Sequence, residues 1–222
     1  MTFTVAIMQP YFLPYAGYFR LIAQSDLFVI YDCVQFPRRG WVHRNKLHDA
    51  NGAEQWLTMP LQAAPQDVLI RDLEFPPGAP AIMAERLRPF RLDQGGPADL
   101  APLLDRLRRP EGDPAAYIAD LLAAVCGYLG LPWNPVRSTS LDVPPSFRGQ
   151  DRILEIARRL GAERYLNAPG GRELYDAAAF AEAGMTLSFL PPYTGPSMSI
   201  LERMLTEDRQ ALSKDVTHAD RG

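Results

Sequence analysis

Residues 3–32 read FTVAIMQPYFLPYAGYFRLIAQSDLFVIYD, and this stretch decides the fold. Residues 3–8 are a short apolar run that ends at a proline, which predicts a buried strand. From Pro14 onward, aromatic and aliphatic residues recur at helical spacing, and proline suits the first turn of a helix. Residues 27–31 form a second apolar run, typical of a strand covered on both faces. The order strand, helix, strand predicts a βαβ unit with a right-handed crossover.

The rest of the chain repeats this alternation around a helical middle. Strands alternating with helices at both ends predict an α/β fold with a doubly wound, mostly parallel, Rossmann-like sheet. Residues 36–54 are polar and are expected to be irregular. Further strands or extended segments are predicted at 55–61, 68–75, 135–143, 164–167 and 185–190, and helices at 80–92, 99–109, 114–129, 150–160, 172–183 and 197–212.

Length favours one elaborated domain. At about 150 residues per domain, 222 residues fit a single α/β domain over 1–212 with a helical insertion at 80–130. A flexible tail is expected at 213–222.

Composition excludes several classes of protein. The 23 basic and 26 acidic residues give a net charge of −3, which argues against general nucleic-acid binding. No apolar run reaches the roughly 18 residues that a membrane span needs, and the N-terminus does not resemble a signal peptide. Cys33 and Cys126 form no CxxC pair, so free thiols and a cytoplasmic location are expected. The oligomeric state stays open.

Parallel sheets bind ligands at the carboxyl ends of their strands, which points to the loops after the first two strands. The first loop holds Gln9, Tyr11, Tyr15 and Tyr18, next to a helix N-terminus that can hold an anion. These tyrosines have an equal claim to be core residues, whereas the Gln9 amide at a strand end needs a partner. The second loop opens with Asp32, a candidate base or metal ligand of a type that also commonly caps turns.

Residues 35–45 carry the strongest local signal. Their arginines offer bidentate binding of phosphate or carboxylate, and the tryptophan can stack on a base or a sugar. The alternative is a solvated charged loop. Basic residues gathered in one loop of an acidic protein favour a small anionic ligand over a long polymer. The candidates here are Gln35, Arg39, Trp41, His43, Arg44 and Asn45.

Two later loops carry weaker signals. Gly170 and Gly171 lie between a predicted strand and helix, where backbone amides can cradle a phosphate, although no Walker lysine or GxGxxG is present. Ser197 and Ser199 precede the closing helix, and they either cap it or meet an anion there. No acidic cluster surrounds His48 in the sequence, so no metal site is predicted. GxSxG and HExxH motifs are absent.

The block AIMQPYFLPYAGYFRLIAQSDLFVIYDCVQFPRRGWVHRNKL, residues 6–47, resembles the opening of the WbqC-like protein family. Segments 56–60, 161–165 and 199–201 extend the likeness over nearly the whole chain, although the family often has Asn where this chain has His43. The resemblance implies a role in bacterial polysaccharide biosynthesis, including the O-antigen of lipopolysaccharide. It also implies acyl or aminoacyl transfer onto an amino sugar.

A remoter likeness is to nucleotidyltransferases and pantothenate synthetases, which carry an HxGH motif after the first strand. Tyr15-Ala16-Gly17-Tyr18 takes that place with both histidines replaced, and Val34-Gln35-Phe36 and Ser197-Met198-Ser199 are similar to two further motifs. Tyrosine hydroxyls bind phosphate but supply no cation at neutral pH. The likeness implies a nucleotidyltransferase-like fold with an anion pocket that has lost standard adenylyl transfer.

The leading hypothesis is therefore a transferase that acylates an amino-sugar amine. Asp32 is expected to accept the proton, since an amine nucleophile needs a base, and Gln9 and Gln35 to orient the reacting groups. Arg39, Arg44 and Asn45 would hold the anionic group of the ligand, on which Tyr11 and Trp41 would stack.

Two alternatives stay open. One is an ATP-dependent amide ligase or nucleotidyltransferase-like enzyme, with Tyr15 and Tyr18 lining the nucleotide pocket. The other is a non-catalytic protein that binds a sugar nucleotide. The cofactor is left open between ATP and an activated acyl donor, and the expected partner is a small anionic substrate, either a sugar nucleotide or that donor.

Overall fold

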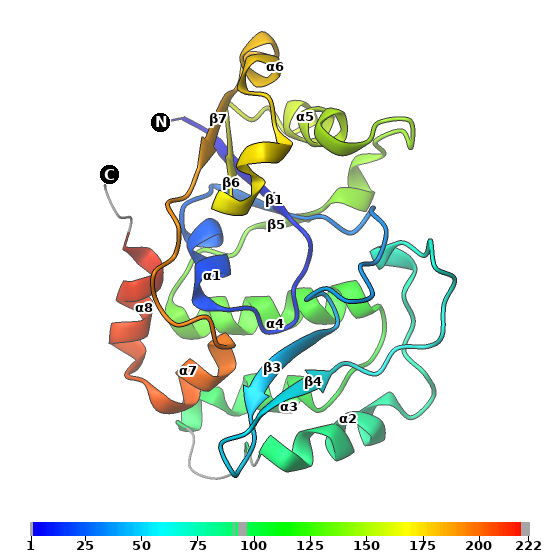
Figure 1. Ribbon diagram of the computed structural model, residues 1–222, viewed down its shortest axis with the longest axis vertical. Coiled ribbons are helices and arrows are strands. Elements are labelled where there is room, and N and C mark those ends of the chain that lie inside the picture. The colour runs from blue at the N-terminus through cyan, green and yellow to red at the C-terminus, as the bar shows by residue number, and fades with distance from the viewer. Residues whose placement is uncertain (1, 91, 93–96, 219–222) are drawn as a thin grey trace.

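A computed structural model describes residues 2–90, 92 and 97–218 (Figure 1). Its central sheet has five strands, all paired in parallel, in the order β5-β2-β1-β6-β7. The chain winds away from β1 first to one side and then to the other, so the strand order reverses between β1 and β6. The sheet consists of β1 (Thr4–Met8), β2 (Leu27–Ile30), β5 (Pro135–Arg137), β6 (Arg164–Asn167) and β7 (Thr186–Phe189).

Helices cover both faces of this sheet. Successive strand residues point to opposite faces, so Ala6 and Phe28 pack into one core while Val5 and Val29 pack into another. The first core includes residues of α1 (Ala16–Ala23) and α4 (Pro114–Leu129), and the second includes residues of α5 (Gly149–Arg159) and α6 (Ala177–Glu182). The predicted α/β fold with a parallel, Rossmann-like sheet is confirmed.

A hairpin and a group of helices lie between β2 and β5. The hairpin pairs β3 (Arg44–His48) with β4 (Glu54–Thr58) in antiparallel register. The expectation that 36–54 is irregular is therefore wrong from Arg44 onward. The charged residues of β3 hid its period of two, because they occupy the alternate positions. The helices are α2 (Ala79–Leu87), α3 (Ala101–Leu107) and α4, with 3-10 helices at Ile70–Asp72, Arg88–Phe90 and Ala98–Leu100.

Three predicted segments differ from the structure in their type. Within the expected strand at 68–75, residues Ile70–Asp72 form a 3-10 helix, and Leu69 makes an isolated β-bridge with Gln35. The extended segment at 135–143 turns into the 3-10 helix Ser138–Leu141 after β5. The helix expected at 172–183 is the 3-10 helix Pro169–Leu174 followed by α6.

The closing helix expected at 197–212 is two helices, α7 (Ile200–Thr206) and α8 (Arg209–Thr217). Asp208 breaks the run and caps α8, since its side chain accepts a hydrogen bond from the Ala211 amide. Leu212 and Val216 are fully buried, so α8 packs beside α1 and α4 (Figure 1). The expected tail from residue 213 is therefore wrong for 213–217. Residues 219–222 of that tail lie outside the described residues.

Both cysteines carry free thiols, with Cys126 buried and Cys33 partly exposed. In the described part of the chain, no helix has the length and apolar character needed to cross a membrane.

Candidate functional site

The loop between β1 and α1 is held from two sides. Leu13 has a φ of 48°, in the left-handed region that residues with a Cβ rarely adopt. Its carbonyl oxygen accepts hydrogen bonds from the Asn45 side-chain amide at 2.5 Å and from the Ser199 hydroxyl at 2.7 Å. Asn45 also donates to the Phe12 carbonyl at 3.2 Å. The hairpin and the segment before α7 therefore fix this loop between them.

One cavity, here called the sheet crevice, lies at the carboxyl ends of β1 and β6 and has a volume of about 440 Å³. Open parallel sheets bind ligands at this place, where the strand order reverses. Gln9 lines the crevice from the loop after β1, and Gly170 and Gly171 line it from the loop after β6. Gly171 has no room for a side chain, because a Cβ there would lie 2.4 Å from the Asn167 side-chain nitrogen.

Aromatic rings and neutral hydroxyls dominate the sheet crevice. Tyr11, Tyr15 and Tyr18 line it, and the Tyr18 hydroxyl donates to the Gln9 carbonyl oxygen at 2.9 Å. Burial raises the pKa of all three hydroxyls, that of Tyr18 most strongly. They therefore stay protonated at neutral pH, which leaves each hydroxyl able to donate a hydrogen bond. No lysine or arginine is among the described residues that line the crevice.

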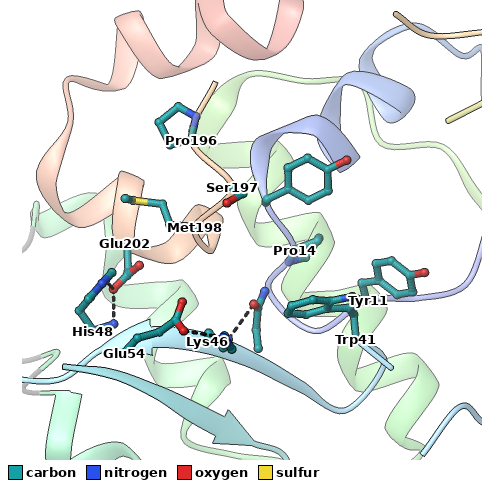
Figure 2. A pocket seen from close by; sticks show the side chains of 12 residues that line it. Tyr11, Pro14, Trp41, Lys46, His48, Glu54, Pro196, Ser197, Met198 and Glu202 are labelled. Atoms are coloured by element: carbon teal, nitrogen blue, oxygen red, sulfur yellow. Dashed lines mark hydrogen bonds and ion pairs between the residues drawn. The ribbon is translucent and has the colours of Figure 1, made fainter. Parts of the chain in front are cut away.

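A second cavity, the hairpin pocket, has a volume of about 720 Å³. It lies between the β3–β4 hairpin, the loop after β1 and the segment that enters α7 (Figure 2). Trp41 and Ser197, two of the predicted site residues, both line this pocket. The fold thus brings them together from distant parts of the sequence. Tyr11 and Tyr15 line both cavities, so the sheet crevice and the hairpin pocket share a wall.

Two ion pairs lie in the hairpin pocket. The Lys46 ammonium lies 2.5 Å from a Glu54 carboxylate oxygen. His48 Nδ1 lies 3.0 Å from Glu202 Oε1. None of these four residues was predicted as a site residue. The sequence signal that could have found Lys46 and His48 is their alternation along β3, a strand that was not predicted. Across the described residues, no three His, Cys, Asp or Glu side chains gather in a way that could hold a metal ion.

The expected arginine site does not form. The Arg44 guanidinium lies over the Trp56 ring, 4.1 Å from its centroid, and donates to the Arg39 carbonyl oxygen. Arg39 itself is exposed, and neither arginine lines a cavity. Burial, reinforced by Arg44 and Arg86, lowers the pKa of His43 to about 4, so His43 is uncharged at neutral pH. This geometry argues against these residues as the anion-binding group.

Asp32 and Gln35 also lie away from both cavities. Asp32 is fully buried, pairs with Arg137 at 2.5 Å, and accepts hydrogen bonds from Ser138 and Thr139. The Gln35 side chain donates to the Gln66 carbonyl oxygen at 2.9 Å. Both residues follow β2, whose end lies beside β5 rather than at the reversal of strand order. Asp32 is thus held in a buried polar network outside the lining of both cavities, which argues against its expected role as a base.

Ser199 also has a structural position. It is buried, it donates to Leu13, and its oxygen caps α7 by accepting from the Leu201 amide. Ser199 therefore caps the helix, which is one of the two alternatives predicted for these serines. Ser197 is exposed and lines the hairpin pocket.

Comparison with known proteins gives two matches. Residues 9–204 match the model of the WbqC-like protein family. The uncharacterized protein Rv1507c of Mycobacterium tuberculosis is 28% identical over an alignment of 238 positions, which covers 93% of this chain and 95% of that protein. No solved structure matches the chain. The range matched by the family model includes the shared wall and every charged residue of the hairpin pocket.

Proposed function

This chain belongs to the WbqC-like protein family, and we propose that it is an enzyme that transfers an acyl or aminoacyl group onto the amine of an amino sugar. The observation that carries this proposal is the wall that Tyr11 and Tyr15 form between two cavities. Transfer between two substrates needs adjoining sites, because holding both reactants together removes much of the entropic barrier. The proposed setting is the assembly of bacterial surface polysaccharide, O-antigen included.

The sheet crevice suits the activated donor. It lies where parallel sheets bind nucleotide-like ligands, and its tyrosine rings offer faces for a base. Gly170 lets a ligand approach the backbone closely, since the position that a side chain would take there is open. The volume of about 440 Å³ falls in the range of small-molecule sites.

The hairpin pocket suits the acceptor sugar. Trp41 is 44% exposed and presents an aromatic surface on which a sugar ring can pack. The carboxylates of Glu54 and Glu202 line the same pocket and can accept hydrogen bonds from hydroxyl and amine groups. Donor and acceptor would then meet beside Tyr11 and Tyr15.

A second candidate is an ATP-dependent amide ligase, and the start of α1 favours it. No side chain caps this helix, and no acidic residue lies in its first turn. The positive end of its dipole therefore suits a phosphate group beside the sheet crevice. In this version a carboxylate attacks the α-phosphate of ATP and pyrophosphate leaves; the amine then attacks the acyl carbon of the acyl adenylate, and AMP leaves.

Thermal-shift measurements with ATP, UDP-glucosamine and acetyl-CoA, followed by mass spectrometry of mixed reactions, test the proposal. We expect UDP-glucosamine and a donor to stabilise the protein together, and an amide product to appear. An amide formed from acyl-CoA without ATP supports the transferase, whereas pyrophosphate release supports the ligase. Stabilisation without product across a panel of acyl donors and amino sugars contradicts both enzymes and supports the non-catalytic binder.

A further inference from the structure

In the hairpin pocket, the carboxylate of Glu202 contacts the side chain of His48. His48 ends β3, and Glu202 lies in the first turn of α7. Glu202 Oε1 accepts a hydrogen bond from the His48 backbone amide and lies 3.0 Å from His48 Nδ1 (Figure 2). One carboxylate oxygen therefore fixes both the backbone and the ring of His48.

This contact also decides where the ring proton lies. An ionised carboxylate only accepts hydrogen bonds, so Nδ1 must be the nitrogen that carries the hydrogen. In the neutral ring the other nitrogen, Nε2, is then an acceptor. The His48 side chain is 47% exposed and lines the pocket, so this nitrogen is accessible to a ligand.

The charge of the hairpin pocket points to the kind of ligand. Among the described residues that line it, the carboxylates of Glu54 and Glu202 outnumber the single lysine. The nearby cation, Lys46, is already paired with Glu54. A ligand with its own positive charge, such as a primary ammonium, fits this arrangement.

We propose that His48 is the catalytic base that removes the proton of the acceptor's amine and that Glu202 is the positioning residue that holds its ring, an inference that rests on the proposed function. His48 Nε2 first takes one proton from the ammonium, and Glu202 stabilises the imidazolium that results. The neutral amine nitrogen then attacks the acyl carbon of the donor and forms the N–C bond. The bond between that carbon and its leaving group breaks, and the leaving group takes the electron pair and the second proton from nitrogen.

Nitrogen-15 NMR of the histidine side chains tests the pair without any acyl transfer. The chain has three histidines, and His43→Gln and His218→Gln assign the signals that do not belong to His48. We expect the neutral His48 ring to carry its hydrogen on Nδ1, and Glu202→Gln to remove this preference. A His48 ring with its hydrogen on Nε2 overturns the proposal, whatever the enzyme's reaction.

Titration with D-glucosamine, D-glucose and N-acetylglucosamine tests the amine site. We expect only glucosamine to shift the His48 signals, and Glu202→Gln to abolish that shift. Glu182→Gln, an exposed change on α6, is the matched control and should retain it. The absence of any amine-dependent shift in the unaltered chain overturns the assignment.

Turnover separates this inference from the proposed function. His48→Gln should lower the rate of amide formation by about 10²–10⁴-fold, the usual contribution of a general base, while His218→Gln leaves it unchanged. Full turnover in His48→Gln overturns the role of His48 and leaves the transferase standing. Amine binding with no amide product from any donor refutes the transferase and leaves the amine site standing.

Discussion

The Ser199 hydroxyl donates a 2.7 Å hydrogen bond to the Leu13 carbonyl, between residues 186 positions apart in the chain. This bond joins the loop after β1 to the start of α7, the two segments that bring Tyr15 and Glu202 to the hairpin pocket. The site therefore depends on a contact that closes only when the last third of the chain has packed.

Ser199→Ala removes this bond together with the cap of α7. We expect a loss of about 1–2 kcal/mol in the free energy of unfolding, measured in urea, because caps and buried hydrogen bonds contribute on this scale. Ser197→Ala is the matched control, since Ser197 is exposed and lies two residues away. Equal stability of the two variants would contradict the role given to Ser199.

Asn45→Asp tests the other side of the same loop. The Asn45 amide donates to the carbonyls of Phe12 and Leu13, and a carboxylate would place a second acceptor against them. We expect a loss of about 2–3 kcal/mol and a collapse of ligand binding in the hairpin pocket. Asn51→Asp, on an exposed turn, should change neither quantity.

Gly17→Ala tests how Tyr15 is positioned. A Cβ at Gly17 would lie 2.2 Å from a Tyr15 ring carbon, so the ring must move while the backbone can stay. We expect the fold to be retained and ligand binding in the sheet crevice to weaken, measured by calorimetric titration with ATP. Gly127→Ala, in open space on α4, should instead stabilise by about 0.5–1 kcal/mol with binding unchanged.

Asp32→Asn separates structure from catalysis. The change removes the charge of a fully buried carboxylate, whose partner Arg137 is 30% exposed and also pairs with Asp113, so a loss of about 1–3 kcal/mol is expected. Asp105→Asn is the surface control, with a change near zero. If folded Asp32→Asn binds ligand but forms no amide, the structural assignment of Asp32 fails and the catalytic one returns.

The pKa of His43 predicts a dependence of stability on pH. Its pKa falls from about 6.5 in the unfolded chain to about 4 in the folded one, so below 6.5 the unfolded state binds the proton more readily. Stability should be full above pH 6.5 and decline as the pH falls toward 4. Urea unfolding of His43→Gln should show a weaker decline over this range than His218→Gln. Parallel pH curves for the two variants would contradict the assignment.

The parallel sheet could be predicted because its strands are apolar runs, as residues 27–30 show. Only the second strand of the hairpin was predicted, at 55–61, because Arg44, Lys46 and His48 occupy the alternate positions of β3 and made it read as a polar loop. Tyr11 and Tyr15 were found by the rule that ligands bind at strand ends, and Gly170 and Gly171 by the glycine-bearing loop between a predicted strand and helix. His48 and Glu202 were not, because they lie 154 residues apart and meet only through tertiary packing.

Asp32, Arg39 and Arg44 were predicted as site residues but do not line either cavity. Their residue types suit catalysis and anion binding, but the same groups also satisfy buried partners and cover aromatic rings. Sequence gives the type of a side chain and not its partner. Which use applies depends on the neighbours that the fold supplies, here Arg137 for Asp32 and Trp56 for Arg44.

A crystal structure of the chain with acetyl-CoA and UDP-glucosamine is the most direct test of the two-cavity site. We expect the donor's nucleotide over Gly170 and Gly171, the sugar amine at His48 and Glu202, and the acyl carbon beside Tyr11 and Tyr15. Both ligands in one cavity, or either ligand bound away from the wall between the two, would contradict the proposed transfer.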